Sequence, residues 1–145
     1  QLRSASTHIG ARTSLGRPVL QNSLARVLLY RGKSDHTAAA LTELHWLPVE
    51  HRVTYKLALL AFRIKTTNQP AYLRKLLAPP RTLRSSNKHL LVETKTDSVL
   101  GSRGFRHSAA TAWNDLPDNI RDTNLSLDSF KHKLKTHLFK LALPA

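Results

Sequence analysis

The stretch LHWLPVEHRVTYKLALLAF, residues 44–62, constrains the fold more than any other part of the sequence. It places Pro48 between two apolar helical patterns, and proline, which lacks an N–H and has a fixed φ, ends one helix and suits the first turn of the next. A helix with two apolar stripes lies between neighbouring elements, so the sequence predicts a central helix over 48–67. The first stripe is Val49, Val53, Leu57, Leu60 and Ile64, and the second is Tyr55, Leu59 and Phe62.

The rest of the chain is also predicted to be mainly α-helical. Apolar residues at helical spacing, with Ser126 as the N-cap of the last helix, predict helices over 18–30, 36–45, 71–77, 106–114 and 127–143. The β-prone runs LLVETKT and SVLGSRGF predict one small β-hairpin near 90–104. We therefore expect about five to six helices with this hairpin. They would form a single helical domain over 18–145 that follows a disordered basic lead-in over 1–17.

Large apolar side chains at helical spacing define the expected core, which consists of Trp46, Leu57, Leu60, Trp113, Phe130 and Leu134. Six aromatic residues could instead be platforms on which unpaired bases stack, but their aliphatic neighbours favour core packing. These six are Trp46, Tyr55, Phe62, Tyr72, Phe105 and Trp113. The last helix could lie on an anionic membrane or hold nucleic acid, but its apolar face favours docking onto the rest of the fold. That face is Phe130, Leu134, Leu138 and Leu141.

Charge is unevenly distributed along the chain. Lys and Arg number 23 against 9 Asp and Glu, a net charge of +14, which is typical of proteins that bind polyanions. No carboxylate side chain occurs among residues 51–92 or after Asp128. Solubilising charge could explain such spans, but their length favours contact with phosphates. The candidate nucleic-acid-binding residues are Arg52, Lys56, Arg63, Arg74, Lys75, Arg81, Arg84, Lys88, Lys131, Lys133, Lys135 and Lys140.

No pattern in the sequence indicates catalytic or metal chemistry. There is no Cys, and no pair of the eight His has the i, i+4 spacing of a helical zinc site. No nucleophile elbow is present. The stretch 101–104, Gly-Ser-Arg-Gly, follows a strand-like run, which favours a tight turn over a nucleotide clamp. We therefore expect no catalytic site, metal, cofactor, small-molecule substrate or membrane partner.

Several stretches go beyond periodicity and occur in a fixed order. They are QNSLARVLLY, DHTAAALTELHWLPVEHRVTYKLALLAF, QPAYLRKLL, RSSNKHLLV, RGFRHSAATAWNDLPDNIR and LSLDSFKHKLKTHLF. Together, over residues 19–141, they closely resemble the carboxy-terminal segment of non-LTR (LINE, jockey-like) retrotransposon polyproteins, downstream of the reverse transcriptase core. The combination of an LHWLPV joint, a basic apolar helix, the Ala-Trp-Asn-Asp-Leu-Pro run and a Lys-rich terminus makes the resemblance specific.

The resemblance implies a non-catalytic accessory region of a larger protein. The parent polyprotein would be an RNA-directed DNA polymerase, but the paired aspartates that bind its metals are not in this sequence. The region would bind RNA or DNA beside the reverse transcriptase core, in an intracellular ribonucleoprotein, nuclear or cytoplasmic and not secreted. The absence of Met and the start at Gln1 fit a fragment. The alternatives are a structural module that packs against the polymerase thumb, and a genomic relic without independent function.

Overall fold

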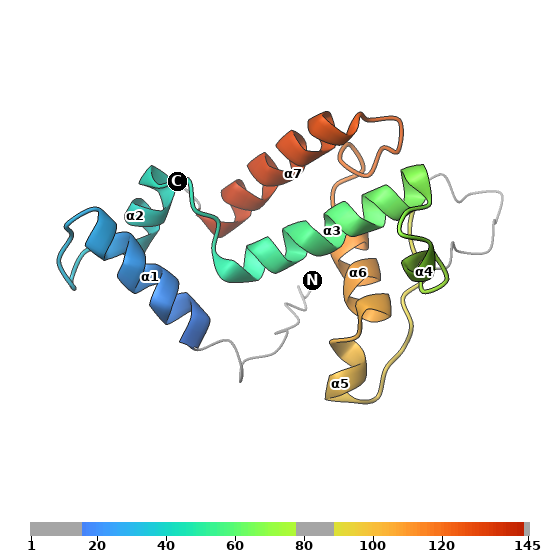
Figure 1. Cartoon of the computed structure of the whole chain (residues 1–145), viewed down its shortest axis with the longest axis horizontal. Helices are drawn as coiled ribbons and strands as arrows, with labels where there is room; N and C mark the ends of the chain where they lie inside the picture. The colour runs from blue at the N-terminus through green and yellow to red at the C-terminus, as the bar shows by residue number, and fades with distance from the viewer. Residues whose placement is uncertain (1–15, 78–88, 144–145) are drawn as a thin grey trace, which may run out of the picture. The chain divides into compact units, whose positions relative to one another are not determined.

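The computed structural model describes residues 16–77 and 89–143, which contain seven α-helices and no β-strand (Figure 1). The helices are α1 (Gly16–Leu28), α2 (Thr37–Glu43), α3 (Val49–Thr67), α4 (Ala71–Arg74), α5 (Val99–Ser102), α6 (Phe105–Asn114) and α7 (Leu127–Ala142). The prediction of a mainly helical chain is confirmed, with slightly more helices than expected. No helix in the described ranges is long and apolar enough to cross a membrane.

The chain divides into two compact units, an amino-terminal unit up to Val49 and a carboxy-terminal unit from Glu50, where the sequence predicted a single domain over 18–145. The expected lead-in over 1–17 lies outside the described residues, except for its last two residues, which already belong to α1.

The amino-terminal unit is a hairpin of α1 and α2, and both helices end in the same kind of cap. Tyr30 and His45 each adopt a left-handed conformation with φ 51°. The residue after each of them donates its N–H to a carbonyl five residues earlier, at 2.9 and 2.8 Å respectively. This is the Schellman arrangement, in which the left-handed position is usually glycine. Two non-glycine residues therefore end helices in a conformation that costs a side-chain-bearing residue about 1–2 kcal/mol.

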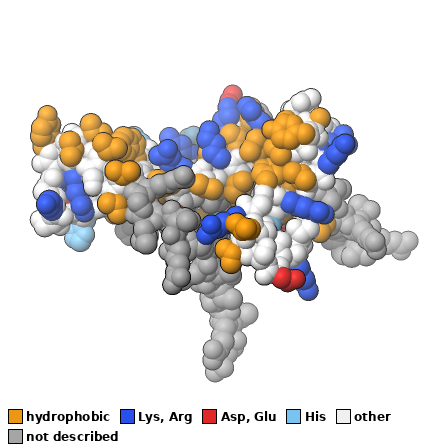
Figure 2. All heavy atoms as spheres, turned by 60° about the horizontal axis from the view of Figure 1, so that its bottom comes forward, with side chains coloured by type: hydrophobic (Ala, Val, Ile, Leu, Met, Phe, Trp, Pro, Cys, Tyr) orange, Lys and Arg blue, Asp and Glu red, His pale blue; other side chains and the backbone are white. Residues whose placement is uncertain are grey.

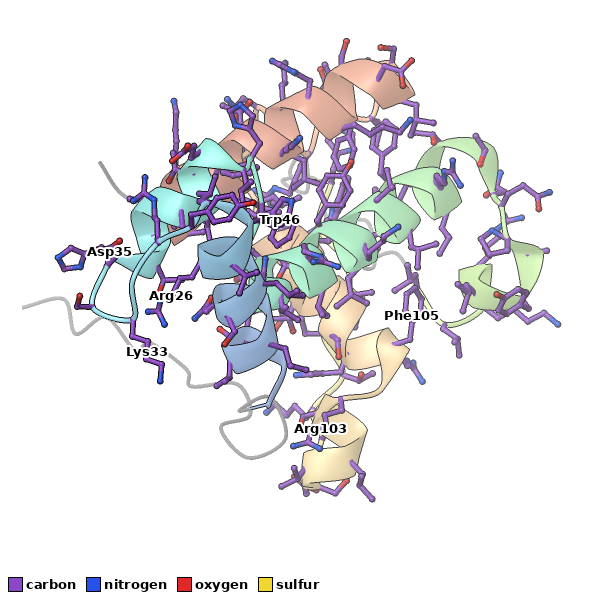
Figure 3. All side chains as sticks on the ribbon, turned by 60° about the vertical axis from the view of Figure 1, so that its left-hand side comes forward. Arg26, Lys33, Asp35, Trp46, Arg103 and Phe105 are labelled. Atoms are coloured by element: carbon purple, nitrogen blue, oxygen red, sulfur yellow. The ribbon has the colours of Figure 1, made fainter. Side chains whose placement is uncertain are left out.

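Polar side chains close this hairpin across its loop. The Arg26 guanidinium donates to the Thr37 hydroxyl at 2.7 Å, and Arg31 pairs with Glu43 at 2.7 Å. Figure 3 shows Arg26 beside the loop that carries Lys33 and Asp35. Arg26 and Arg31 therefore bind other side chains of the same unit.

The Trp-Leu-Pro joint before α3 is held by one buried side chain, Gln21 of α1, which is 7% exposed. Its Nε2 donates to the Leu47 carbonyl at 3.0 Å, and its Oε1 accepts from the N–H of Val49, the first residue of α3, at 3.1 Å. Pro48, which has no N–H to satisfy, lies between these two bonds. Trp46 is only half-buried (labelled in Figure 3), so the prediction that it anchors the core is wrong. The joint is organised by the glutamine amide instead.

The core of the carboxy-terminal unit lies where α3, α6 and α7 meet (Figure 1). Its largest fully buried side chains are Phe62, Trp113, Phe130 and Leu134. The Phe130 ring stacks on Phe62 with a centroid distance of 4.1 Å and on Trp113 at 6.1 Å. One aromatic residue from each of the three helices therefore fixes how they pack.

The buried face of α3 lies between the two predicted stripes and includes one member of each, Ile64 and Phe62. Its buried residues are Ala58, Ala61, Phe62 and Ile64, whereas the predicted core residues Leu57 and Leu60 are half-buried and Val53 is 51% exposed. Half of these buried residues are alanines, and α6 likewise buries Ala109, Ala110 and Ala112. The prediction is correct for Phe62 and Ile64 and wrong for Leu57 and Leu60, because large apolar residues alone do not reveal a face that is centred on alanines.

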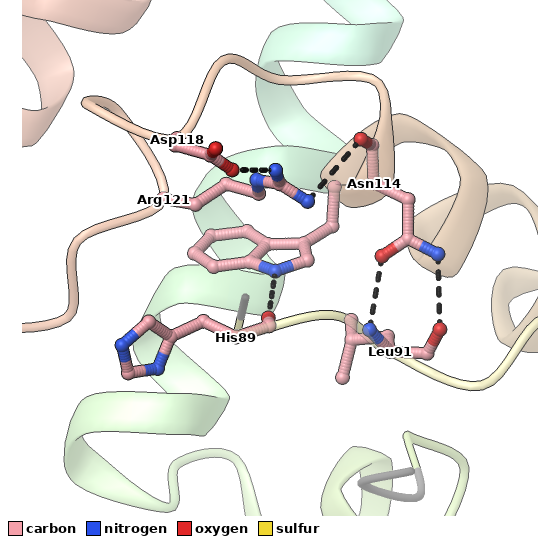
Figure 4. A network of polar contacts seen from close by, with 6 residues as sticks. His89, Leu91, Asn114, Asp118 and Arg121 are labelled. Carbon is pink, nitrogen blue, oxygen red and sulfur yellow. Dashed lines mark hydrogen bonds and ion pairs between the residues drawn. The ribbon is translucent and has the colours of Figure 1, made fainter. Parts of the chain in front are cut away.

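The predicted β-hairpin near 90–104 is absent from the described residues. Residues 89–96 have no regular secondary structure, and the second half of the expected hairpin forms α5, which Ser98 caps by accepting from the Gly101 N–H at 3.0 Å. The segment 89–96 bonds to the side chains of α6 instead of a second strand (Figure 4). The Asn114 amide accepts from the Leu91 N–H and donates to the Leu91 carbonyl, both at 2.9 Å.

Two further contacts complete this arrangement, which we call the Asn114 clasp. It consists of the hydrogen bonds of the Trp113 and Asn114 side chains to His89, Leu91 and Glu93. The Trp113 indole N–H donates to the His89 carbonyl at 2.7 Å, and Asn114 Nδ2 donates to Glu93 at 2.8 Å. A side-chain amide therefore supplies the hydrogen bonds that a neighbouring strand would have given. The Ala-Trp-Asn-Asp-Leu-Pro run is a structural element of this unit.

The loop after α6 is tied back to the same site. Arg121 is only 7% exposed. Its guanidinium donates to the Asn114 carbonyl at 3.5 Å and forms an ion pair with Asp118 (Figure 4). The chain then enters α7, where the Ser126 hydroxyl accepts from the Ser129 N–H at 3.2 Å. Ser126 is therefore the N-cap that the sequence predicted.

Candidate nucleic-acid interface

Three of the predicted basic residues form one row on α3. Arg52, Lys56 and Arg63 are all exposed and lie within about 40° of one another around the helix axis. The sequence placed them in a seam between two apolar stripes. Because the buried face contains Ala58 and Ala61, the row lies on the opposite side of the helix. It extends about 16 Å along the axis, at 1.5 Å per residue.

Lys65, another lysine of the acid-free span, is not part of this row. Its Nζ lies 5.6 Å from the centroid of the Trp113 ring, and burial lowers its pKa. The structure therefore assigns Lys65 to the edge of the core.

A second group of cations follows directly on α4, only three residues after α3 ends. Arg74 and Lys75 are both exposed there. The neighbouring Tyr72 is 72% exposed, so its predicted core packing is wrong. The predicted residues Arg81, Arg84 and Lys88 lie outside the described residues.

The lysines of α7 do not form the single basic side that the sequence suggested. Lys131 and Lys135 lie on one flank of the buried stripe, and Lys133 and Lys140 lie on the other, each about 60–120° from the centre of that stripe. Lys131 pairs with Asp128 at 3.0 Å, and Lys135 lies 5.7 Å from the Phe139 ring centroid.

The stripe between these flanks is shorter than expected. Phe130, Leu134 and Leu138 are buried, as docking requires, but Leu141 is 60% exposed. The apolar contact of α7 with its own unit therefore ends near Leu138.

Sequence reasoning did not select Lys95, Arg103 and Arg106, which are exposed on and around α5 and α6 (Arg103 is labelled in Figure 3). They lie in the part of the sequence that contains most of the Asp and Glu, and the candidate residues were chosen from spans without acids. Counting them, eleven exposed Lys and Arg of the described carboxy-terminal unit have no carboxylate side chain within 4.0 Å. On the face drawn in Figure 2, Lys and Arg form several separate groups between hydrophobic areas, and Asp and Glu are sparse.

The acidic and histidine side chains form no comparable site. Within the described ranges, no group of three or more His, Cys, Asp or Glu could hold a metal ion. Burial, and then the neighbouring Glu93, raise the pKa of Asp115, the residue after the Asn114 clasp.

No family model, curated protein or solved structure matches this chain.

Proposed function

We propose that this chain is a non-catalytic region that binds the sugar–phosphate backbone of RNA or DNA, as an accessory to a retrotransposon reverse transcriptase. The observation that carries the proposal is the set of eleven exposed Lys and Arg without carboxylate partners in the carboxy-terminal unit. Cations left free by the protein are available to phosphates, and each contact releases condensed counterions from the nucleic acid. The assignment to a retrotransposon rests on the resemblance of residues 19–141 and on nothing else.

The α3 row supplies the central contact in this proposal. A helix braced on its buried side holds Arg52, Lys56 and Arg63 along a line of about 16 Å. One strand of B-form DNA carries a phosphate every 3.4 Å of helix axis, so the row is long enough to follow about five phosphates of one strand. Such contacts fix the position of the nucleic acid and carry no base sequence information.

The test is the salt dependence of binding in a variant of the α3 row. The triple variant Arg52→Gln, Lys56→Gln, Arg63→Gln should reduce the slope of log K against log salt concentration by about 2–3, because each lost phosphate contact removes about 0.7–0.9. Its circular dichroism spectrum and melting temperature should match those of the parent chain, because all three side chains are exposed.

The matched control is Lys95→Gln, Arg103→Gln, Arg106→Gln, which removes the same charge from three other exposed positions. It should change the slope less. Equal losses in both triple variants would mean that net charge, and not the α3 row, governs binding. Absence of any binding to RNA or DNA at about 50 mM salt would contradict the proposed function as a whole.

An exposed apolar stripe on α1 favours a second candidate, the structural module that packs against the polymerase. Its members are Leu20, Leu24, Val27 and Leu28, which are 53–70% exposed. In this case the chain would bind a separately expressed reverse transcriptase core of the same element, and the double variant Leu24→Glu, Val27→Glu would abolish that binding. Binding that survives this change would contradict the module.

A further inference from the structure

The side chain of Tyr72 on α4 is unlike the other large aromatic residues of the carboxy-terminal unit. Phe62, Trp113 and Phe130 are at most 2% exposed, whereas Tyr72 is 72% exposed. Burial of an aromatic side chain is strongly favourable, so an exposed ring keeps a face that a planar ligand can cover. Exposure alone does not select Tyr72, because Tyr30 of the other unit is 98% exposed; the charge around Tyr72 does.

The local backbone places a cation beside this ring. The chain at the end of α4 tightens into i→i+3 hydrogen bonds, with the Leu76 N–H donating to the Leu73 carbonyl at 3.0 Å. Side chains three residues apart are nearly eclipsed in such a turn. Lys75 therefore extends from the same side as Tyr72, and the buried Leu77, 6% exposed, anchors the segment to the unit.

The charge around Tyr72 has one sign. Arg74 and Lys75 are exposed, and no carboxylate side chain occurs in the sequence from residue 51 to residue 92. The cation–π pairs of the described residues are Lys65 with Trp113 and Lys135 with Phe139. Neither Arg74 nor Lys75 covers the Tyr72 ring, so its face is open to a planar ligand.

We propose that Tyr72 is a stacking platform for an unpaired base, with Arg74 and Lys75 contacting the flanking phosphates. This inference rests on the proposed function and adds a substrate class to it, single-stranded nucleic acid. Aromatic rings beside a positively charged track bind single strands because the face of every unpaired base can stack on them. In a duplex the faces of the bases already stack on one another, so only the phosphates remain available to α4.

The experiment measures the binding of the full chain to three labelled oligonucleotides of equal length by fluorescence anisotropy: a single strand, the same strand with abasic sites, and the duplex. Tyr72→Ala should weaken binding to the single strand about 5- to 150-fold, the range for loss of one stacked base. It should leave duplex binding within about twofold and leave the salt slope unchanged, because no phosphate contact is lost. Tyr72→Phe keeps the ring and should bind like the parent chain.

Two comparisons isolate the stacking contact. The abasic strand should bind the parent chain as weakly as the intact strand binds Tyr72→Ala, and the substitution should weaken abasic binding no further. Tyr30→Ala is the matched control, because Tyr30 is 98% exposed in the other unit and should leave all three affinities unchanged.

The results that would overturn the inference differ from those that would overturn the proposed function. Salt-dependent binding that is unaffected by Tyr72→Ala, or weakened equally for single strand and duplex, would reject the stacking platform and leave backbone binding intact. No binding to any of the three oligonucleotides would reject both. If Tyr72→Ala alters the circular dichroism spectrum, Tyr72→Leu replaces it as the test, since leucine keeps an apolar side chain without a ring.

Discussion

Replacing Asn114 tests whether a side chain can stand in for a β-strand, as the Asn114 clasp indicates. Asn114→Ala removes two bonds of 2.9 Å to the backbone of Leu91 and one of 2.8 Å to Glu93. The Leu91 side chain remains in the core at 5% exposure, so its N–H and carbonyl lose their partners in a partly buried position.

The expected cost follows from these contacts. A buried backbone group left without a partner costs about 1–3 kcal/mol, and the gain in helix propensity from alanine at the last residue of α6 offsets up to about 0.7 kcal/mol. Since water reaches part of this site, we expect Asn114→Ala to lower the free energy of unfolding by about 2–3 kcal/mol.

The assay is urea unfolding followed by tryptophan fluorescence in a Trp46→Phe background, where Trp113 in the core is the remaining tryptophan. Asn119→Ala, an exposed asparagine in the next loop, is the control and should change the free energy of unfolding by less than about 0.5 kcal/mol. Asn114→Asp keeps the acceptor for Leu91 but turns an oxygen toward Glu93, so it should destabilise at neutral pH and recover in acid. If Asn114→Ala and Asn119→Ala unfold at the same urea concentration, the reasoning is refuted.

Three further predictions concern stability. Gln21→Leu should lower the free energy of unfolding of the amino-terminal unit by about 2 kcal/mol, because the Leu47 carbonyl and the Val49 N–H lose their bonds to the amide. Helical ellipticity should then be lost at a lower urea concentration, and no change would mean that water replaces the glutamine amide. Tyr30→Gly should stabilise the α1–α2 hairpin against heat by about 1 kcal/mol, because glycine adopts φ 51° without strain, whereas an unchanged melting temperature would contradict the left-handed cap. Burial and Glu93 raise the pKa of Asp115, so the folded state binds this proton more tightly and stability falls as pH rises above the ordinary carboxyl value of about 3.9. Asp115→Asn should therefore be more stable than the parent in urea at pH 7 but not at pH 3, and an equal difference at both values would exclude the titration.

Local signals in the sequence predicted much of the fold. Ser126 caps α7 and Pro48 precedes α3 as expected, because both effects depend on a few adjacent residues. The β-propensity of residues 90–96 was misleading, because they form no strand and bond to the side chains of α6 instead. Their partner could not be predicted, because Asn114 is 23 positions from Leu91 and nothing local marks an asparagine that bonds a distant backbone.

In the candidate site, too, local properties could be predicted and the arrangement in space could not. Most of the predicted cations within the described residues are exposed, as charge alone requires. Which of them share a surface depends on the helix face that is buried, and on α3 that choice is made by Ala58 and Ala61. Alanine contributes little to an apolar pattern, so the sequence did not indicate which face of α3 is buried. For that reason neither the position of the α3 row nor the partial burial of Lys65 could be predicted.

The Asn114 clasp also couples residues 89–96 to the end of α6. Trp113 and Asn114 can reach His89 and Leu91 together only when the last turn of α6 is helical. Amide exchange at Leu91 then reports on α6, because the N–H is released whenever the last turn of that helix opens. A chain shortened to end before Trp113 would lose every bond of the clasp, although the His107 ring would still contact the Thr94 carbonyl.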